Sequence, residues 1–337
     1  MYNISRHIRQ ALCAVALTAG AAAISGCSSA IDDDLPPCPT GAELRFVYNY
    51  NMEFANAFPS QVDCLTLLVY DANGSLVTTR TELTDVLADE DYRMIVELPV
   101  GKYHFVAYGG MACDKSSFHF VNSIAEGSSL SNLSLRMHPE YIGANPGVEL
   151  HPLFYGNLDF TVPENSITYT AATVYMMKDT NNLRIMLQNI EGQPISPDDF
   201  TWEITDDNTL FDGDNNVVPT ESGLTYNPWT TGLGQAGSQG DTNIEVAFAE
   251  FSTSRLTANS SSRLVIKRAK DGEVVISIPL VNYLLLLKSQ HFASMSSQEF
   301  LDRESRWNMI FFLQHGSWLD TRIVINDWIV RLNSADL

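Results

Sequence analysis

The chain has 337 residues, of which 20 are basic and 40 acidic, and its formal net charge at pH 7 is −20. A surface this acidic repels nucleic acid and anionic lipid headgroups, so we expect no nucleic-acid partner. The length is sufficient for two domains of ordinary size after an N-terminal leader.

The first 26 residues have the layout of a secretory signal peptide. Arg6 and Arg9 give a basic start, residues 11–24 are mostly apolar, and the small pair Ser25-Gly26 ends the segment. The apolar stretch is shorter than the roughly 20 residues that a membrane-spanning helix needs, so we interpret it as a signal that is removed. Loss of the two arginines takes the net charge from −20 to −22, because 18 basic and 40 acidic residues remain.

A lipid-attachment box, Ile24-Ser25-Gly26-Cys27, closes this segment. Cleavage before Cys27 exposes a thiol and an amine that can both carry acyl chains, and more than one chain makes membrane attachment durable. We therefore predict a bacterial lipoprotein with its lipid on Cys27. The alternative is an ordinary signal cleaved near the same point, which leaves a secreted protein.

Residues 27–42 are expected to form an extended tether. They contain Asp32-Asp33-Asp34 and three prolines, a composition that cannot bury apolar surface. The acidic run resembles the export signal that follows the lipidated cysteine in surface lipoproteins of Bacteroidales. A solvated linker without a signalling role is the alternative interpretation.

Five cysteines become three if Cys13 leaves with the signal and Cys27 carries lipid. Cys38, Cys64 and Cys113 then remain, and an oxidising exterior allows one disulfide between two of them. The sequence leaves the choice of pair open. None of the spacings is that of a zinc or thioredoxin-type site.

Period-two alternation predicts β-strands through the first half of the mature chain. The segment 65–70 alternates, and Asn73-Gly74 after it is a strong hairpin signal. Turn residues separate the further strands, which favours a β-sandwich. The other expected strands of this half are 93–98, 102–108, 132–137 and 154–162.

The same pattern begins again after Pro163. A short helix is predicted at 297–306, and the four glycines between 232 and 240 indicate a mobile loop. The expected strands are 172–177, 183–188, 200–205, 244–251, 263–269, 273–280, 307–313 and 321–332. We place a domain boundary near residue 168, so the predicted parts are a signal peptide (1–26), a lipid-anchored tether (27–42), and two domains at 43–168 and 169–337.

Chemistry-bearing motifs are weak. Neither a Gly-x-Ser-x-Gly nucleophile elbow nor a His-Glu-x-x-His zinc helix occurs, so we expect no enzyme and no cofactor. Asp212, Asp214 and Asn216 have the spacing of a calcium loop, but the glycine and glutamate of a complete EF-hand are missing, and an Asp/Asn-rich turn is favoured. Trp229, beside Pro228, is the best candidate for an exposed aromatic, whereas Trp202, Trp307 and Trp328 lie in apolar strand-like runs.

Several short segments follow one another in a characteristic order: Cys38-Pro39; Leu68-Val69-Tyr70-Asp71 with Gly74; Glu97 to Tyr103; Ile278-Pro279-Leu280 before Tyr283-Leu284; Gln298 to Glu304; and Ile325-Asn326-Asp327-Trp328. In this order they resemble the FimB/Mfa-like family of fimbrial anchor lipoproteins from Bacteroidales, whose members help to build type V fimbriae. The resemblance implies an all-β fold of two tandem transthyretin-like β-sandwich domains, no catalysis, fimbrial stalk subunits as partners, and a surface-exposed position in the fimbrium.

Stalk subunits of such fimbriae polymerise by strand complementation, in which a trimmed subunit accepts a strand from its neighbour. If the first strand here, roughly 43–50, were cut away, the lipid on Cys27 would leave with it. We therefore expect the strand to be retained, although Arg45 lies within it. A subunit whose groove stays filled can donate a strand but cannot accept one, so it ends the polymer and holds it on the outer membrane.

The predicted donor is the last strand, with Arg322, Val324, Trp328 and Val330 as its candidate residues. Only five residues follow Leu332, so the alternative is that this strand completes its own domain. Two other functions remain open from the sequence: a surface lipoprotein that binds a glycan or another host or bacterial surface ligand, and a fimbrial tip or accessory adhesin.

Overall fold

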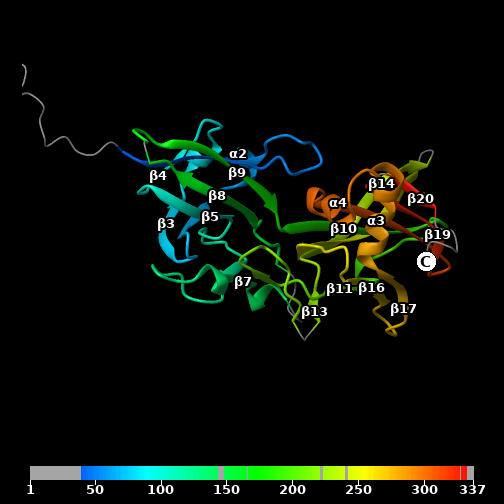
Figure 1. Cartoon of the computed structure of the whole chain (residues 1–337). Coiled ribbons are helices and arrows are strands. Elements are labelled where there is room, and N and C mark those ends of the chain that lie inside the picture. Colours follow the sequence, from blue (N-terminus) through cyan, green and yellow to red (C-terminus); the bar gives the residue numbers. More distant parts are fainter. Residues whose placement is uncertain are drawn as a thin grey trace, which may run out of the picture. The chain divides into compact units, whose positions relative to one another are not determined.

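The structure is a computed structural model (Figure 1), and it describes residues 39–142, 148–164, 166–220, 223–239, 242–326 and 328–331. The predicted signal peptide, Cys27, most of the tether and Cys38 lie outside the described residues. Within the described ranges, no helix has the length and apolar character needed to cross a membrane.

The first half of the chain forms a seven-stranded sheet in the order β3-β2-β5-β8-β9-β1-β4. Its strands are β1 (Gly41–Val47), β2 (Leu65–Asp71), β3 (Leu76–Glu82), β4 (Met94–Glu97), β5 (Gly101–Gly109), β8 (Phe154–Val162) and β9 (Thr170–Lys178). The predicted hairpin is present, because Gly74 has φ +75° and the Asp71 carboxylate accepts the N–H groups of Asn73 and Ser75.

Strand β9 turns this sheet into a sandwich. Its first part pairs in parallel with β1, from Ala42↔Thr170 to Val47↔Tyr175, and its last part pairs antiparallel with Phe154–Gly156 of β8. At that crossing a Cβ on Gly156 would lie 2.6 Å from the Met176 sulfur, so only glycine fits. The layer of β4 and β1 therefore faces the layer of β2, β5 and β8 across one buried apolar cluster.

The second half forms another sandwich, with a six-stranded sheet in the order β14-β15-β10-β18-β19-β20 and a four-stranded sheet in the order β13-β11-β16-β17. Buried residues of both sheets share one cluster, which confirms the prediction of an all-β, β-sandwich fold. The strands are β10 (Thr180–Asn189), β11 (Phe200–Asp206), β13 (Leu224–Tyr226), β14 (Thr230–Gln239), β15 (Thr242–Ser254), β16 (Arg263–Arg268), β17 (Val274–Pro279), β18 (Arg306–Gln314), β19 (Ser317–Ile325) and β20 (Trp328–Arg331).

Helices are few. The α-helices are α2 (Phe58–Gln61), α3 (Leu280–His291) and α4 (Ser297–Arg303), and the 3-10 helices are η1 (Asp85–Ala88), η2 (Leu130–Asn132), η3 (Pro139–Tyr141) and η4 (Pro197–Asp199). The predicted short helix is α4, where the Ser296 hydroxyl accepts the N–H of Glu299 as an N-cap. Helix α3 was not predicted, since a short apolar run is compatible with either a strand or a buried helix.

Two sequence-based expectations are corrected by the sheet pairing. Strand β9 belongs to the first sheet, which therefore extends to Lys178, past the boundary expected near residue 168. The predicted loop at 232–240 overlaps the edge strand β14, which pairs with β15. Its glycine content serves packing, because a Cβ on Gly232 would lie 2.8 Å from the Phe248 ring.

A small sheet joins the two halves. Strand β12 (Leu210–Asp212) pairs with β7 (Ser134–Met137), which in turn pairs with β6 (Phe118–Phe120). One apolar cluster contains residues from both sides of the predicted boundary, including Tyr108 and Leu183. Folding of the halves as separate domains stays a prediction.

Candidate strand-exchange site

Strand β1 lies inside its sheet rather than at an edge. It pairs antiparallel with β4, from Gly41↔Glu97 to Leu44↔Met94, and in parallel with β9. Leu44 is fully buried and Phe46 is 3% exposed. The predicted strand at 43–50 is thus observed at 41–47, and it fills the groove between its two neighbours.

Arg45 has an exposed side chain, but its backbone is part of this ladder. It pairs with Thr173 of β9. Proteolysis needs a backbone that can leave its partners, so the position of Arg45 protects it despite the exposed guanidinium.

The chain that follows β1 folds into a tight loop at residues 48–57. The side-chain amide of Asn51 is buried and donates to the carbonyls of Tyr48 (3.0 Å) and Ala55 (2.8 Å). The Asn56 side chain accepts the N–H groups of Tyr48 (3.0 Å) and Phe58 (3.1 Å). These bonds satisfy the backbone of the loop from within.

Arg303 of α4 fastens that loop to the second half of the chain. Its guanidinium carbon lies 4.1 Å from the ring centre of Tyr50 and 4.6 Å from that of Phe54. The same group donates to Glu299 of its own helix (2.9 Å) and to the carbonyl of Asn51 (3.5 Å). We call the loop 48–57 together with Arg303 the clasp.

The clasp holds Phe54 in a costly conformation. Phe54 has φ +54°, a left-handed region that bulky residues seldom adopt, and the residue is 59% exposed. Burial and then the carboxylates of Asp302 and Glu299 raise the pKa of Tyr50, whereas Arg303 lowers it. The cation–π contacts of Arg303 give a reason for this arrangement.

A buried polar network supports α4 from behind. The Asp302 carboxylate receives two hydrogen bonds of 2.8 Å from Arg255, whose third donor reaches the carbonyl of Asn215. Asp179, the residue between β9 and β10, is fully buried, and Asn215 donates to it (3.0 Å). Burial raises the pKa of Asp179 to about 7, against the opposing effect of Arg255.

The predicted donor strand is divided between two strands, which corrects the single strand expected at 321–332. Arg322 and Val324 belong to β19, whereas Trp328 and Val330 belong to β20, and the two strands form an antiparallel pair. Strand β19 also pairs with β18. Asn326 has φ +44° at the turn, and the dipeptide Asn326-Asp327 was the signal in the sequence that could have revealed it.

Strand β20 is therefore the last of the described strands, and it lies at the edge of the six-stranded sheet. Among the described residues it pairs with β19 alone, and Ile329 is 61% exposed. The donor role of Arg322, Val324, Trp328 and Val330 stays a prediction, and Cys27 lies outside the described residues.

The structure selects Cys64 and Cys113 as the disulfide pair, which ties the start of β2 to the loop after β5. Asp63 and His151 lie beside it, with the His151 Nε2 atom 3.0 Å from the Asp63 carboxylate. Three separate segments bring the potential ligand atoms of these four side chains within 4.8 Å of one another, which no spacing in the sequence indicates. The bond between the two sulfurs makes them unavailable as ligands.

The candidate calcium loop is an Asp/Asn-rich turn. One Asp212 oxygen accepts the N–H groups of Asp214 (3.0 Å) and Asn216 (2.8 Å). Trp202 and Trp307 are buried, as expected for core residues. Trp229 is only partly exposed, and its indole N–H is buried.

The paired sandwiches and the filled strand groove describe a structural subunit of the β-sandwich class. Residues 35–334 match the model of the fimbrillin-A associated anchor proteins Mfa1 and Mfa2. The chain therefore belongs to this family, whose members are structural proteins associated with fimbriae at the cell surface.

Three solved structures illustrate the relationship. A proposed adhesin from Bacteroides thetaiotaomicron is 50% identical, with a TM-score of 0.84 and coverage of 89% of this chain and 100% of that one. A proposed polysaccharide-binding protein from the same species is 31% identical, with a TM-score of 0.75 and the same coverage. The fimbrial anchor protein Mfa2 from Porphyromonas gingivalis shares the fold at 17% identity, with a TM-score of 0.65 and coverage of 87% and 99%. A search of curated proteins found no match to the chain.

Proposed function

We propose that this protein is a lipid-anchored outer-membrane subunit that holds a fimbrium on the cell surface and ends the polymer. The observation that carries the proposal is the position of β1, which is buried between β4 and β9 and lies a short tether away from Cys27. A subunit that keeps its first strand keeps its lipid.

The polymer-ending role follows from the same strand. Strand complementation requires a vacant groove in the acceptor, and β1 fills the groove of this chain. The chain can then join a stalk subunit only through a strand of its own. Strand β20 is the candidate, because it pairs on one side and its loss leaves the rest of the six-stranded sheet paired.

Deletion of the gene tests the anchor role. We expect long filaments in the medium, because nothing would end the polymer or hold it on the cell. Unchanged filaments on the cells would contradict the proposal.

Substitution of single cysteines tests the lipid. Cys27→Ala should move both the protein and the fimbriae from the membrane fraction to the medium, whereas Cys38→Ser, a matched change in the tether, should leave both on the cell. Fimbriae that stay attached to Cys27→Ala cells would refute lipid anchoring.

Ligand binding is a second candidate function on the same fold. Two relatives at 50% and 31% identity are described as a proposed adhesin and a proposed polysaccharide-binding protein. Binding on a glycan array by the purified protein would support this role, and a silent array together with loss of fimbrial attachment in the deletion strain would favour the anchor alone. We propose no catalytic activity.

A further inference from the structure

The disulfide of the first sandwich lies among side chains that can do more than form a cross-link. Asp63, Cys64, Cys113 and His151, which we call the cysteine cluster, each offer one potential ligand atom, and these atoms lie within 4.8 Å of one another. Two sulfurs, an imidazole nitrogen and a carboxylate oxygen form a set that zinc binds with tetrahedral geometry. Among the described residues, no other group of three or more such side chains has this spacing.

The Asp63 carboxylate contacts two of the other members of the cluster. One of its oxygens is 3.0 Å from Nε2 of His151 and 3.2 Å from the sulfur of Cys113. A tetrahedral zinc ion at about 2.0–2.3 Å from its ligands keeps them roughly 3.3–3.8 Å apart. These donors therefore already have nearly the spacing that zinc needs, and the main change required is that the two bonded sulfurs separate.

Backbone contacts hold the segments of the cluster together independently of the disulfide. The N–H of Gly110 donates to the carbonyl of Cys64 (3.0 Å). Gly110 has φ +88°, and a Cβ there would clash with the carbonyl oxygen of Pro152. The N–H of His151 donates to the hydroxyl of Ser117 (2.7 Å). Reduction therefore breaks the sulfur–sulfur bond but leaves these segments side by side.

The cluster is open to solvent on one side. Cys113 is half-buried and the Asp63 side chain is 57% exposed, whereas Cys64 is buried. A small reductant and a metal ion can both reach the cluster from the side of Cys113.

We propose that the cysteine cluster binds one zinc ion when its disulfide is reduced, through two thiolates, the imidazole of His151 and the carboxylate of Asp63. A dithiol reductant supplies two electrons and two protons, is itself oxidised to a disulfide, and leaves two thiols in the protein. Zinc then displaces both thiol protons to the solvent. The ion and the disulfide are alternative cross-links between the start of β2 and the loop after β5. Zinc therefore keeps the thiols of Cys64 and Cys113 together, and away from Cys38, until they are oxidised.

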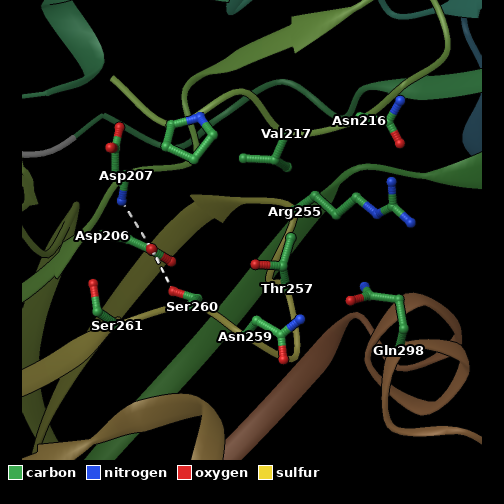
Figure 2. Close-up of a pocket in the computed structure, with 11 residues that line it drawn as sticks. Asp206, Asp207, Asn216, Val217, Arg255, Thr257, Asn259, Ser260, Ser261 and Gln298 are labelled. Carbon is green, nitrogen blue, oxygen red and sulfur yellow. Dashed lines mark hydrogen bonds between the residues drawn. The ribbon is translucent and has the colours of Figure 1, made fainter. Parts of the chain in front are cut away.

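The polar cavity beside the end of β11 in the second sandwich (Figure 2) lacks this donor set. There an oxygen of Asp206 accepts the N–H of Asp207 (2.8 Å) and the hydroxyl of Ser260 (2.5 Å). An oxygen of Asp207 accepts the N–H (2.7 Å) and the hydroxyl (2.6 Å) of Thr220. None of the described residues that line the cavity is a cysteine or a histidine, so zinc should bind at the cysteine cluster instead.

Zinc titration of the detergent-purified mature protein tests the proposal. All proteins carry Cys38→Ser, so that this thiol neither binds zinc nor pairs with the cluster. They are reduced with a water-soluble phosphine, which is oxidised to its oxide, and are then freed of reductant and metal under nitrogen. In competition with a chromophoric chelator, the reduced protein should bind one zinc per chain at least roughly 100-fold more tightly than the oxidised protein. Cobalt(II) in place of zinc should give thiolate-to-metal charge-transfer absorption.

His151→Ala removes one ligand and should weaken zinc binding by at least roughly tenfold. His104→Ala is the matched control, because His104 also pairs with an aspartate of the first sandwich, 2.7 Å from Asp159, but lies outside the cluster. It should bind zinc like the protein without this substitution. Near-UV circular dichroism establishes whether each reduced protein is folded. If His151→Ala is not, Asp63→Ala takes its place with the same expected loss.

Four results would overturn the site. They are no zinc binding by the folded, reduced protein, equal affinity of the reduced and oxidised proteins, equal affinity of His151→Ala and its parent protein, and a reduced protein that unfolds and does not refold with zinc. None of these results depends on fimbrial attachment, so the proposed anchor role is tested separately.

Discussion

The first and last strands of the described fold occupy opposite structural positions. Strand β1 is buried, pairs on both sides, and continues into a loop that α4 holds. Strand β20 is four residues long, pairs on one side, and exposes Ile329. Strand exchange requires that a strand can leave its own sheet at small cost. The contrast therefore supports the proposed retention of the first strand and the proposed donation of a strand at the C-terminal end of the fold.

The largest expected effect is at the core of β1. Phe46→Ala removes a buried aromatic ring that stacks on Phe58 and should lower the free energy of unfolding by about 3–5 kcal/mol. Urea denaturation measures the change. Arg45→Ala, the exposed neighbour on the same strand, is the control and should stay within about 0.5 kcal/mol. If the two substitutions lower the free energy of unfolding by similar amounts, burial of its side chains is not what holds β1 in place.

A pH-dependent effect is expected at Asp179, which follows the strand that pairs with β1. Burial raises its pKa to about 7 in the folded protein, above the ordinary value near 4 of the unfolded chain. The folded state then binds the proton more tightly, so this group stabilises the fold at low pH and loses that contribution as the pH rises from about 4 through 7.

Asp179→Asn removes the titration and should flatten the pH dependence of unfolding between pH 5 and pH 8, by on the order of 2 kcal/mol. Denaturation in urea at the two pH values gives the difference. Asp214→Asn, an exposed carboxylate on the neighbouring turn, is the control. An unchanged pH slope in Asp179→Asn would show that the carboxyl is already ionised at low pH.

A smaller effect is expected at the clasp. Arg303→Ala removes the contacts with Tyr50 and Phe54 and the pair with Glu299, and should cost about 1–2 kcal/mol. Hydrogen exchange should rise in the loop 48–57 and in β1, and Arg303→Lys should recover only part of the protection because ammonium lacks the planar stacking of guanidinium. Unchanged hydrogen exchange in β1 would show that the clasp does not help to hold this strand in its sheet.

The smallest effect on stability is expected at β20. Ile329→Lys changes an exposed side chain on an edge strand and should stay within about 0.5 kcal/mol. If β20 is the donated strand, the same substitution should still weaken capture of a stalk subunit in a pull-down assay, since donated side chains must fill pockets in the acceptor. If the Ile329→Lys protein captures the stalk subunit as well as the unchanged protein does, β20 is not the donated strand.

The sequence predicted local elements better than their partners. Alternation located most strands, Asn73-Gly74 located the hairpin, and the cap at Ser296 agrees with the predicted helix. Period-two alternation does not say which sheet a strand joins, so β9 was assigned to the wrong half. The clasp could not be predicted, because Asn51 and Arg303 are 252 positions apart and their contact depends on the packing of both halves.

The placement of Gly41 has a mechanical consequence. Gly41 is the first residue of β1, and a Cβ there would lie 2.0 Å from the carbonyl oxygen of Val96, so the chain enters the fold directly against β4. If lipid on Cys27 holds the protein, any pull on the fimbrium reaches the fold first at Thr40, which exchanges two hydrogen bonds with Leu98, and then at Gly41. The load would then be shared by the ladders on both sides of β1, and the clasp would bear it next.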